Sequence, residues 1–129
     1  MTSRAPDDLP ATSLDGRRVL VVEDSPVVAA ACEDMLRDMG CAVIGPATNM
    51  AAALQMAAEE EAGAAIVDIN IRGDKAFPVL KILLARGIPF LLTSGYADWT
   101  MPEEWQGQPR LAKPYTPNML RESLIQLLG

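Results

Sequence analysis

The sequence contains no histidine among its 129 residues. This absence excludes histidine as a general base, the Ser-His-Asp and Cys-His catalytic arrangements, and the common zinc sites. It also means that the chain cannot itself donate a phosphoryl group from a histidine. Any chemistry must therefore rest on carboxylates, hydroxyl groups, a lysine and hard metal ions.

Cysteines and long apolar runs are also scarce. Cys32 and Cys41 form no C-x-x-C motif, so we interpret them as reduced residues of a cytoplasmic protein. No apolar run reaches the ~20 residues that span a bilayer, and the N-terminus lacks the apolar region of a secretory signal. The net charge is −6, without a basic stripe. We therefore expect no nucleic-acid partner and no membrane partner.

The length suits one domain with a core that needs neither disulfides nor metal. Half of the residues are hydrophobic and 22% are charged, as in ordinary globular proteins. Residues 1–16 hold prolines, serines and charges without apolar periodicity, which indicates a flexible tail. We expect the folded domain to span residues 17–129.

Short apolar runs alternate with helical patterns along this domain. The predicted strands are Val19–Val22, Ala42–Gly45, the run Ala64–Asn70, Ile88–Thr93 and Leu111–Ala112. The predicted helices cover about Pro26–Met39, Met50–Glu61, Ala76–Ala85 and Pro117–Leu128. This alternation predicts an α/β fold, a doubly wound five-stranded parallel sheet with helices on both faces. The segment Ala97–Pro109 is poor in helix signals, so we expect a loop with at most one short helical turn and a reduced or absent fourth helix.

Polar side chains stand where four of these strands end. Glu23 and Asp24 follow the first strand, and Asp68 lies at or just beyond the end of the third. Ser94 and Lys113 follow the fourth and fifth strands. In the flavodoxin-like strand order 2-1-3-4-5, the first and third strands are neighbours at the switch point, so the three carboxylates should meet. Such acids repel unless they are protonated or bridged by a cation, and their hard oxygens suit Mg²⁺.

These residue types predict phosphoryl transfer onto a carboxylate. Asp68 would be the nucleophile, while Glu23, Asp24 and Mg²⁺ would neutralise the phosphoryl oxygens. Ser94 would hydrogen-bond one phosphoryl oxygen, and Lys113 would supply a positive charge. Each residue alone has a simpler reading, as a helix cap, a turn residue or a loop residue. Their coincidence at successive strand ends favours one shared site.

From about Arg18 to Leu128 the chain resembles a response-regulator receiver domain of two-component signalling. The motifs that carry the resemblance are Val-Val-Glu-Asp-Ser (21–25), Val-Asp-Ile-Asn (67–70), Thr-Ser-Gly-Tyr (93–96) and Lys-Pro-Tyr (113–115). The resemblance implies that Asp68 is the phosphoacceptor and a Mg²⁺ ligand. It further implies the following roles: Glu23 and Asp24 as the acidic pair with Asp24 the more direct ligand, Asn70 as a ligand through its backbone carbonyl, Ser94 as the switch hydroxyl and Lys113 as the phosphoryl contact.

Some features depart from the common receiver pattern. Ile71-Arg72-Gly73 stands where many receivers have Met-Pro, and Arg110 stands where many carry a switch aromatic. Together with Pro-Phe-Leu-Leu-Thr-Ser-Gly-Tyr (89–96), these features resemble an atypical group of mostly single-domain receivers. That group has a Phe-Ala-Thr-Gly-x-Tyr signature, which is matched in part. Tyr96 is then either the mobile aromatic or a packed surface tyrosine.

The resemblance implies a signalling phosphoacceptor that is no enzyme beyond its own phosphorylation and dephosphorylation. Its phosphoryl group would come from a histidine kinase or a histidine phosphotransfer protein. The chain ends just after the last predicted helix, so we expect a stand-alone receiver that signals by altered docking to a downstream protein. Trp99, Met101 and Trp105 would provide a docking surface or cap the sheet.

Three alternatives stay open beside this expectation. One is a pseudo-receiver, a protein-interaction module that works without phosphorylation. Another is a receiver domain cut from a hybrid histidine kinase. The third is a small α/β enzyme, either a flavin carrier or a haloacid-type phosphatase. A flavin carrier needs a hydroxyl- and glycine-rich phosphate loop after its first strand, and the phosphatase needs Asp-x-Asp; Glu23-Asp24-Ser25 fits neither.

Overall fold

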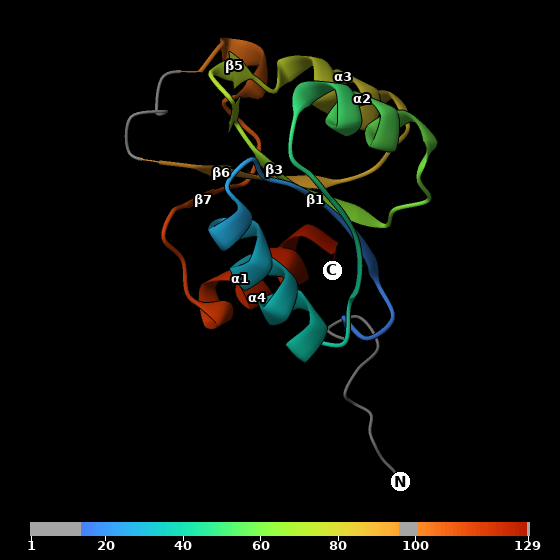
Figure 1. The fold of residues 1–129 in the computed structure, drawn as a ribbon, viewed down its shortest axis with the longest axis vertical. Coiled ribbons are helices and arrows are strands. Elements are labelled where there is room, and N and C mark those ends of the chain that lie inside the picture. Colours follow the sequence, from blue (N-terminus) through green and yellow to red (C-terminus); the bar gives the residue numbers. More distant parts are fainter. Residues whose placement is uncertain (1–13, 96–100, 129) are drawn as a thin grey trace, which may run out of the picture.

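The computed structural model describes residues 14–95 and 101–128. A central sheet separates two layers of helices, with α1 and α4 on one face and α2 and α3 on the other (Figure 1). The strands of the sheet are β1 (Arg18–Val22), β2 (Ala42–Ala47), β3 (Ala64–Asp68), β6 (Phe90–Ser94) and β7 (Arg110–Ala112). The helices are α1 (Pro26–Asp38), α2 (Met50–Glu59), α3 (Phe77–Ala85) and α4 (Pro117–Leu128).

The sheet has the order β2-β1-β3-β6-β7, and every neighbouring pair is parallel. This confirms the predicted doubly wound, flavodoxin-like sheet of order 2-1-3-4-5. β1 and β3 lie side by side with Val22 opposite Val67, so both strands end at the same edge. The switch point of the fold therefore lies where the sequence placed it.

Two apolar cores explain why the central strands are continuous apolar runs. Leu20 and Val22 of β1 pack into the core beneath α2 and α3. Val19 and Val21 pack into the core beneath α1 and α4. Because neighbouring side chains of a strand point to opposite faces, a strand covered on both faces has to be apolar throughout.

The helix ends follow their local sequence. The Ser25 hydroxyl accepts a hydrogen bond from the Val28 N–H (3.4 Å), and Pro26 occupies the first turn of α1. Asn49 caps α2 in the same way, through the Ala52 N–H (2.8 Å). Within the part of the chain that the structure describes, no helix has the length and apolar character that crossing a membrane requires.

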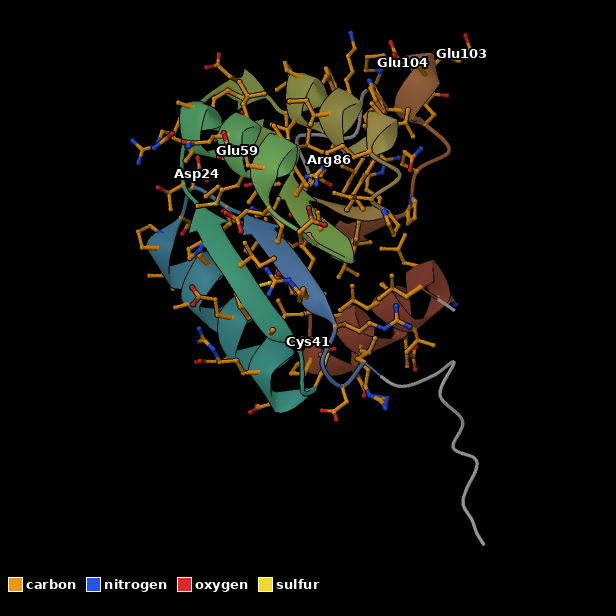
Figure 2. All side chains as sticks on the ribbon, turned by 90° about the vertical axis from the view of Figure 1, so that its right-hand side faces the viewer. Asp24, Cys41, Glu59, Arg86, Glu103 and Glu104 are labelled. Atoms are coloured by element: carbon orange, nitrogen blue, oxygen red, sulfur yellow. The ribbon has the colours of Figure 1, made fainter. Side chains whose placement is uncertain are left out.

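The predicted end of α2 at Glu61 was wrong by two residues. The helix ends at Glu59, because Glu60 has an extended backbone with ψ 147°. Arg86, the C-cap of α3, donates hydrogen bonds to the carbonyl oxygens of Ala57 (2.7 Å) and Glu60 (2.9 Å). Figure 2 shows Arg86 between the two helices. The end of α2 is therefore fixed by a residue of another helix.

The segment after β3 forms a small hairpin, and Asn70, expected in the third strand, belongs to this hairpin instead. β4 (Asn70–Ile71) pairs antiparallel with β5 (Asp74–Lys75). Arg72 and Gly73 form the two-residue turn, with φ of +51° and +89°. Positive φ at both positions is what a type I′ hairpin turn requires. Strands of two residues are too short to show a period, which is why the pattern did not reveal them.

Between β6 and β7, the described residues 101–109 contain one regular element, the 3₁₀-helix η3 (Glu103–Trp105). This confirms the reduced fourth helix. Trp105 is 3% exposed, stacks on Phe77 of α3 with ring centroids 6.2 Å apart, and contacts Phe90 of β6. Trp105 therefore caps the sheet, and Met101 is buried in the same core. Tyr96 and Trp99 lie outside the described residues.

Residues 14–16 pack against the domain, although the sequence assigned them to the tail. Leu14 is buried in the α1–α4 core, and its carbonyl oxygen accepts a hydrogen bond from the Cys41 thiol (3.5 Å). The Gly16 N–H donates to the carbonyl oxygen of Gly40 (2.8 Å). Residues 1–13, the rest of the predicted tail, lie outside the described residues.

Candidate functional site

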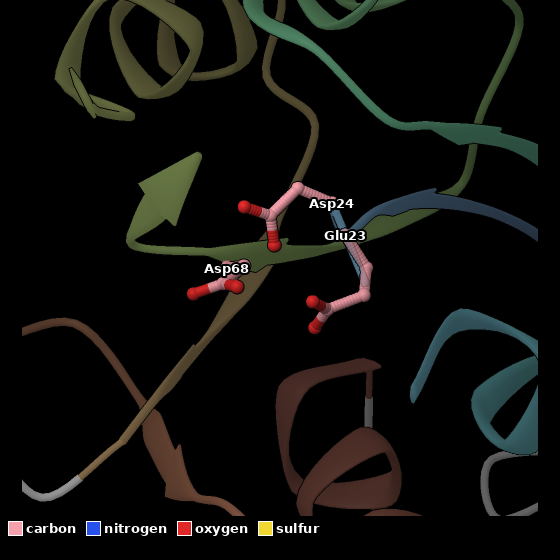
Figure 3. A group of neighbouring side chains, drawn as sticks. All are labelled: Glu23, Asp24 and Asp68. Atoms are coloured by element: carbon pink, nitrogen blue, oxygen red, sulfur yellow. The ribbon is translucent and has the colours of Figure 1, made fainter. Parts of the chain in front are cut away.

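Three carboxylates gather where β1 and β3 end. Glu23 and Asp24 follow β1, and Asp68 is the last residue of β3. One oxygen of each carboxylate lies within 4.8 Å of the others. Figure 3 shows the three side chains turned toward a common space at this edge. The structure thus brings together the acids that the sequence predicted to meet.

Lys113 joins two of these acids. It follows β7, and its Nζ lies 2.9 Å from Asp68 Oδ2 and 3.2 Å from Glu23 Oε1. Burial acts to lower the pKa of Lys113, but its hydrogen bond to Asp68 and the charges of Asp68 and Glu23 outweigh burial and raise the pKa above its ordinary value. The lysine is therefore held in its charged form.

The surroundings of Glu23 oppose its charged form. Its side chain is buried, and its Oε2 accepts a hydrogen bond from the Ser25 N–H (3.1 Å). Burial, followed by the nearby charge of Asp68, raises the pKa of Glu23 to about 7, against the opposing effect of Lys113. One lysine does not balance three clustered carboxylates. A donor set of hard oxygens with uncompensated negative charge fits a divalent cation such as Mg²⁺.

The β4–β5 hairpin contributes backbone donors to the cluster. The Asn70 N–H donates to Asp68 Oδ1 (3.1 Å), and the Arg72 N–H donates to Asp24 Oδ2 (2.8 Å). These bonds fix the orientation of two carboxylates from outside their own strands. The sequence predicted Asn70 as a ligand but gave Arg72 no place in the site, because its partner lies 48 residues earlier in the chain.

Ser94 closes β6, beside the pair formed by Asp68 and Thr93. It is fully buried, and its Oγ has no hydrogen-bond partner in the structure. A buried hydroxyl without a partner costs free energy, so it needs an explanation such as a ligand, an ion or a catalytic role. Ser94 therefore has an unused hydrogen bond at the end of the strand that neighbours β3.

The family model described as the response regulator receiver domain matches residues 19–124. The chain belongs to this family. A comparison with curated proteins found no match.

Solved receiver structures share the fold. SdrG from Sphingomonas melonis is 34% identical, with a TM-score of 0.80 over 88% of this chain and 98% of that one. The BeF3-activated conformation of SdrG is also 34% identical, with a TM-score of 0.75 over 87% and 96% of the two chains. The receiver domain of the sensor histidine kinase PA1611 from Pseudomonas aeruginosa, with magnesium in its active-site cleft, is 25% identical, with a TM-score of 0.76 over 88% and 98%.

The structure gives a place to each departure from the common receiver pattern. Ile71-Arg72-Gly73, which replaces Met-Pro, is the end of β4 and the turn of the hairpin. Arg110, at the position of the switch aromatic, begins β7 opposite Leu92 of β6. The partial match to the Phe-Ala-Thr-Gly-x-Tyr group rests in part on Tyr96, which the described residues do not include.

The receiver also has an apolar groove that no sequence pattern revealed. It has a volume of about 380 Å³ and lies between α1 and the segment Lys113–Tyr115. Burial raises the pKa values of Cys32 and Tyr115, two of its lining residues, above their ordinary values. Lys113 lines this groove and also contacts Asp68, so the groove opens beside the acidic cluster.

Proposed function

We propose that this receiver domain accepts a phosphoryl group on Asp68 from the phosphohistidine of a histidine kinase or a histidine phosphotransfer protein. The observation that carries the proposal is the contact between Lys113 Nζ and Asp68 Oδ2 at 2.9 Å, at the edge where Glu23 and Asp24 also lie. A carboxylate oxygen of Asp68 attacks the phosphorus. The phosphorus–nitrogen bond breaks, and the imidazole nitrogen leaves with the electron pair, which produces an acyl phosphate.

Mg²⁺ is the cofactor that the donor set fits. Glu23, Asp24 and Asp68 would hold it through carboxylate oxygens, and Asn70 through its backbone carbonyl. When bound, the ion supplies positive charge that offsets the charge of the phosphoryl oxygens. The magnesium in the PA1611 receiver, a relative of 25% identity, supports this assignment.

Ser94 and Lys113 supply the other contacts to the phosphoryl group. The buried Ser94 hydroxyl, which lacks a partner, would donate a hydrogen bond to one phosphoryl oxygen. The Lys113 ammonium would form a hydrogen bond to another phosphoryl oxygen, and its contacts with Glu23 and Asp68 would weaken. SdrG, which is 34% identical, has been solved in a BeF3-activated conformation, and BeF3 resembles a phosphoryl group in shape and charge, which supports this arrangement.

Phosphorylation of Asp68 would act on partners by changing the conformation of the segment that joins β6 to β7. Engagement of Ser94 by the phosphoryl group would shift the equilibrium of this segment and change the surface offered to a downstream protein. Trp105 packs against Phe77 of α3 and Phe90 of β6, and Met101 is buried in the same core, so both belong to the element that would have to move.

The apolar groove beside Lys113 suits the phosphodonor. A helix of the phosphodonor protein, packed in this groove against α1 and Tyr115, would hold its phosphohistidine next to Asp68. This follows because Lys113 both lines the groove and contacts Asp68. We propose that this protein acts in the cytoplasm, where the phosphohistidine of its partner would have to lie to reach Asp68. Its chemistry consists of gaining and losing one phosphoryl group, without turnover of a separate substrate.

Intact-mass spectrometry tests the proposed function. The protein is incubated with acetyl phosphate in the presence and absence of Mg²⁺, beside Asp68→Ala and the control Asp38→Ala, which removes an exposed carboxylate at the end of α1. We expect one phosphoryl adduct that requires Mg²⁺, persists in the control and disappears in Asp68→Ala. A wild type that gains no adduct and binds no Mg²⁺ would favour the phosphorylation-independent pseudo-receiver.

A further inference from the structure

Arg72 connects the hairpin turn to the ends of two other strands. Its backbone N–H donates to Asp24 Oδ2 (2.8 Å), in the segment after β1. Its side-chain Nε donates to the carbonyl oxygen of Thr48 (3.0 Å), just after β2. One residue of the β4–β5 turn therefore holds both a carboxylate of the acidic cluster and the neighbouring backbone.

The turn that presents this N–H is itself fixed. Ile71 is 1% exposed and anchors the hairpin in the α2–α3 core. Among the described residues, Arg72 is the one non-glycine residue with positive φ, at +51°. A residue with a β-carbon adopts this conformation at a cost, which is retained where the surrounding structure requires it. Here the conformation directs the Arg72 N–H at Asp24.

The hydrogen bond from the Arg72 N–H occupies one oxygen of Asp24 and leaves the other oxygen to bind a cation. Figure 3 shows one oxygen of Asp24 directed toward Asp68 and the other directed away from it. A carboxylate with an oxygen held by a short N–H bond is disfavoured as a bidentate ligand, because bidentate binding needs both oxygens to face the cation. Asp24 is therefore arranged to offer a single oxygen.

We propose that Arg72 is a positioning residue that holds Asp24 as a one-oxygen ligand and thereby favours a small octahedral cation over Ca²⁺. The proposal rests on the Mg²⁺ site of the proposed function. Ca²⁺ takes about six to eight oxygens and accepts bidentate carboxylates, whereas Mg²⁺ requires near-octahedral geometry and keeps several waters. Fixing Asp24 in the one-oxygen form lowers the ordering cost for Mg²⁺ and withholds a ligand from Ca²⁺.

Titration calorimetry of the full chain with Mg²⁺ and with Ca²⁺ tests the selectivity. Arg72→Gly removes the side-chain bond to Thr48 that helps to hold the turn in place, so it should loosen the N–H bond to Asp24, while glycine still tolerates positive φ. Arg121→Ala, on the exposed side of α4, removes the same charge elsewhere. We expect Mg²⁺ affinity to fall about 3- to 10-fold in Arg72→Gly, Ca²⁺ affinity to stay unchanged or rise because Asp24 is freer to bind through both oxygens, and the control to match the wild type. Equal losses for the two ions, or no loss of Mg²⁺ affinity, would overturn the proposal.

A measurement on the wild type covers the case in which Arg72→Gly does not fold. Amide hydrogen exchange at Arg72 is followed by NMR without and with saturating Mg²⁺. Protection that persists with Mg²⁺ supports the proposal, because Asp24 then keeps its N–H bond while it binds the ion. Faster exchange with Mg²⁺ would overturn it. A wild type that binds no Mg²⁺ would instead contradict the proposed function, so the two failures are distinguishable.

Discussion

Lys113 and Asp68 form an ion pair with 2.9 Å between Nζ and Oδ2, although they lie 45 residues apart in the chain. The pair joins the segment after β7 to the end of β3. Lys113 also contacts Glu23, so a single ammonium holds together acids from two strands. The protein without Mg²⁺ therefore depends on this lysine to offset the repulsion within the cluster.

Replacing Lys113 by methionine tests that dependence. Lys113→Met leaves Glu23 and Asp68 buried without their cation, so we expect the free energy of unfolding without Mg²⁺ to fall by about 1–3 kcal/mol. Mg²⁺ should bind the variant more tightly than the wild type, because a competing positive charge is gone. Urea unfolding with and without Mg²⁺ measures both effects. Unchanged stability together with unchanged Mg²⁺ affinity would refute the role assigned to the pair.

The raised pKa of Glu23 predicts a pH dependence of metal binding. With a pKa of about 7, Glu23 must lose a proton before it can serve as a ligand. Mg²⁺ affinity should therefore increase about tenfold between pH 6 and pH 8. Titration calorimetry at several pH values measures this increase, and Glu23→Gln should remove most of it. An increase of the same size in Glu23→Gln would show that another group is responsible.

Glu23 also makes the stability of the protein without Mg²⁺ depend on pH. Stability should fall as the pH rises, whereas Mg²⁺ affinity should increase. The pKa of Glu23 rises from 4.5 to about 7 on folding, so between these values the folded state binds more protons than the unfolded state. The contribution of Glu23 to the free energy of unfolding is therefore largest below pH 4.5 and is lost as the pH rises to 7. The difference between wild type and Glu23→Gln in urea unfolding, measured from pH 5 to pH 8, isolates it. A difference that does not vary with pH would contradict the assigned pKa.

Ser94→Ala should affect the response to BeF3 without lowering the stability of the protein. The variant removes a buried hydroxyl that has no partner, so the unphosphorylated protein should be as stable as the wild type or more stable by up to about 1 kcal/mol. With Mg²⁺ and BeF3, however, the NMR shift changes around β6 should be lost. Ser123→Ala on α4 serves as the control and should respond as the wild type does. A full BeF3 response in Ser94→Ala would show that this hydroxyl is not the switch.

Replacing Trp105 tests whether the segment before β7 covers the sheet in place of the reduced helix between β6 and β7. The indole stacks on Phe77 and contacts Phe90, so Trp105→Ala should lower the free energy of unfolding by about 3–5 kcal/mol. Met119→Ala on α4, where the side chain is 42% exposed, should have little effect. Urea unfolding compares the two variants. A small loss in Trp105→Ala would mean that this side chain is not part of the core.

Much of this architecture could be predicted from the sequence, because the functional side chains stand at the ends of strands. Their positions in space then follow from the order of the strands in the sheet. Once the alternation predicted a parallel sheet, the switch-point rule required Glu23, Asp24 and Asp68 to meet. The structure brings them together, with Lys113 beside them. The acids follow the neighbouring strands β1 and β3, whereas Lys113 reaches them from the end of β7, on the far side of β6.

Other features had no local signal. The two-residue strands of the hairpin are too short for any period, and the bond from the Arg72 N–H to Asp24 depends on where that turn lies in space. Arg86 ends α2 from another helix, so the end at Glu59 could not be read from α2 itself. The burial of Leu14 depends likewise on contacts with the α1–α4 core.

The most direct test of the central claim is the location of the phosphoryl group. After incubation with Mg²⁺ and a phosphodonor, borohydride reduction converts an aspartyl phosphate to homoserine, and peptide mass spectrometry then locates the converted residue. The account predicts conversion at Asp68 alone, dependent on Mg²⁺. Conversion at another carboxylate, or a stable phosphoryl adduct that borohydride does not convert, would contradict it.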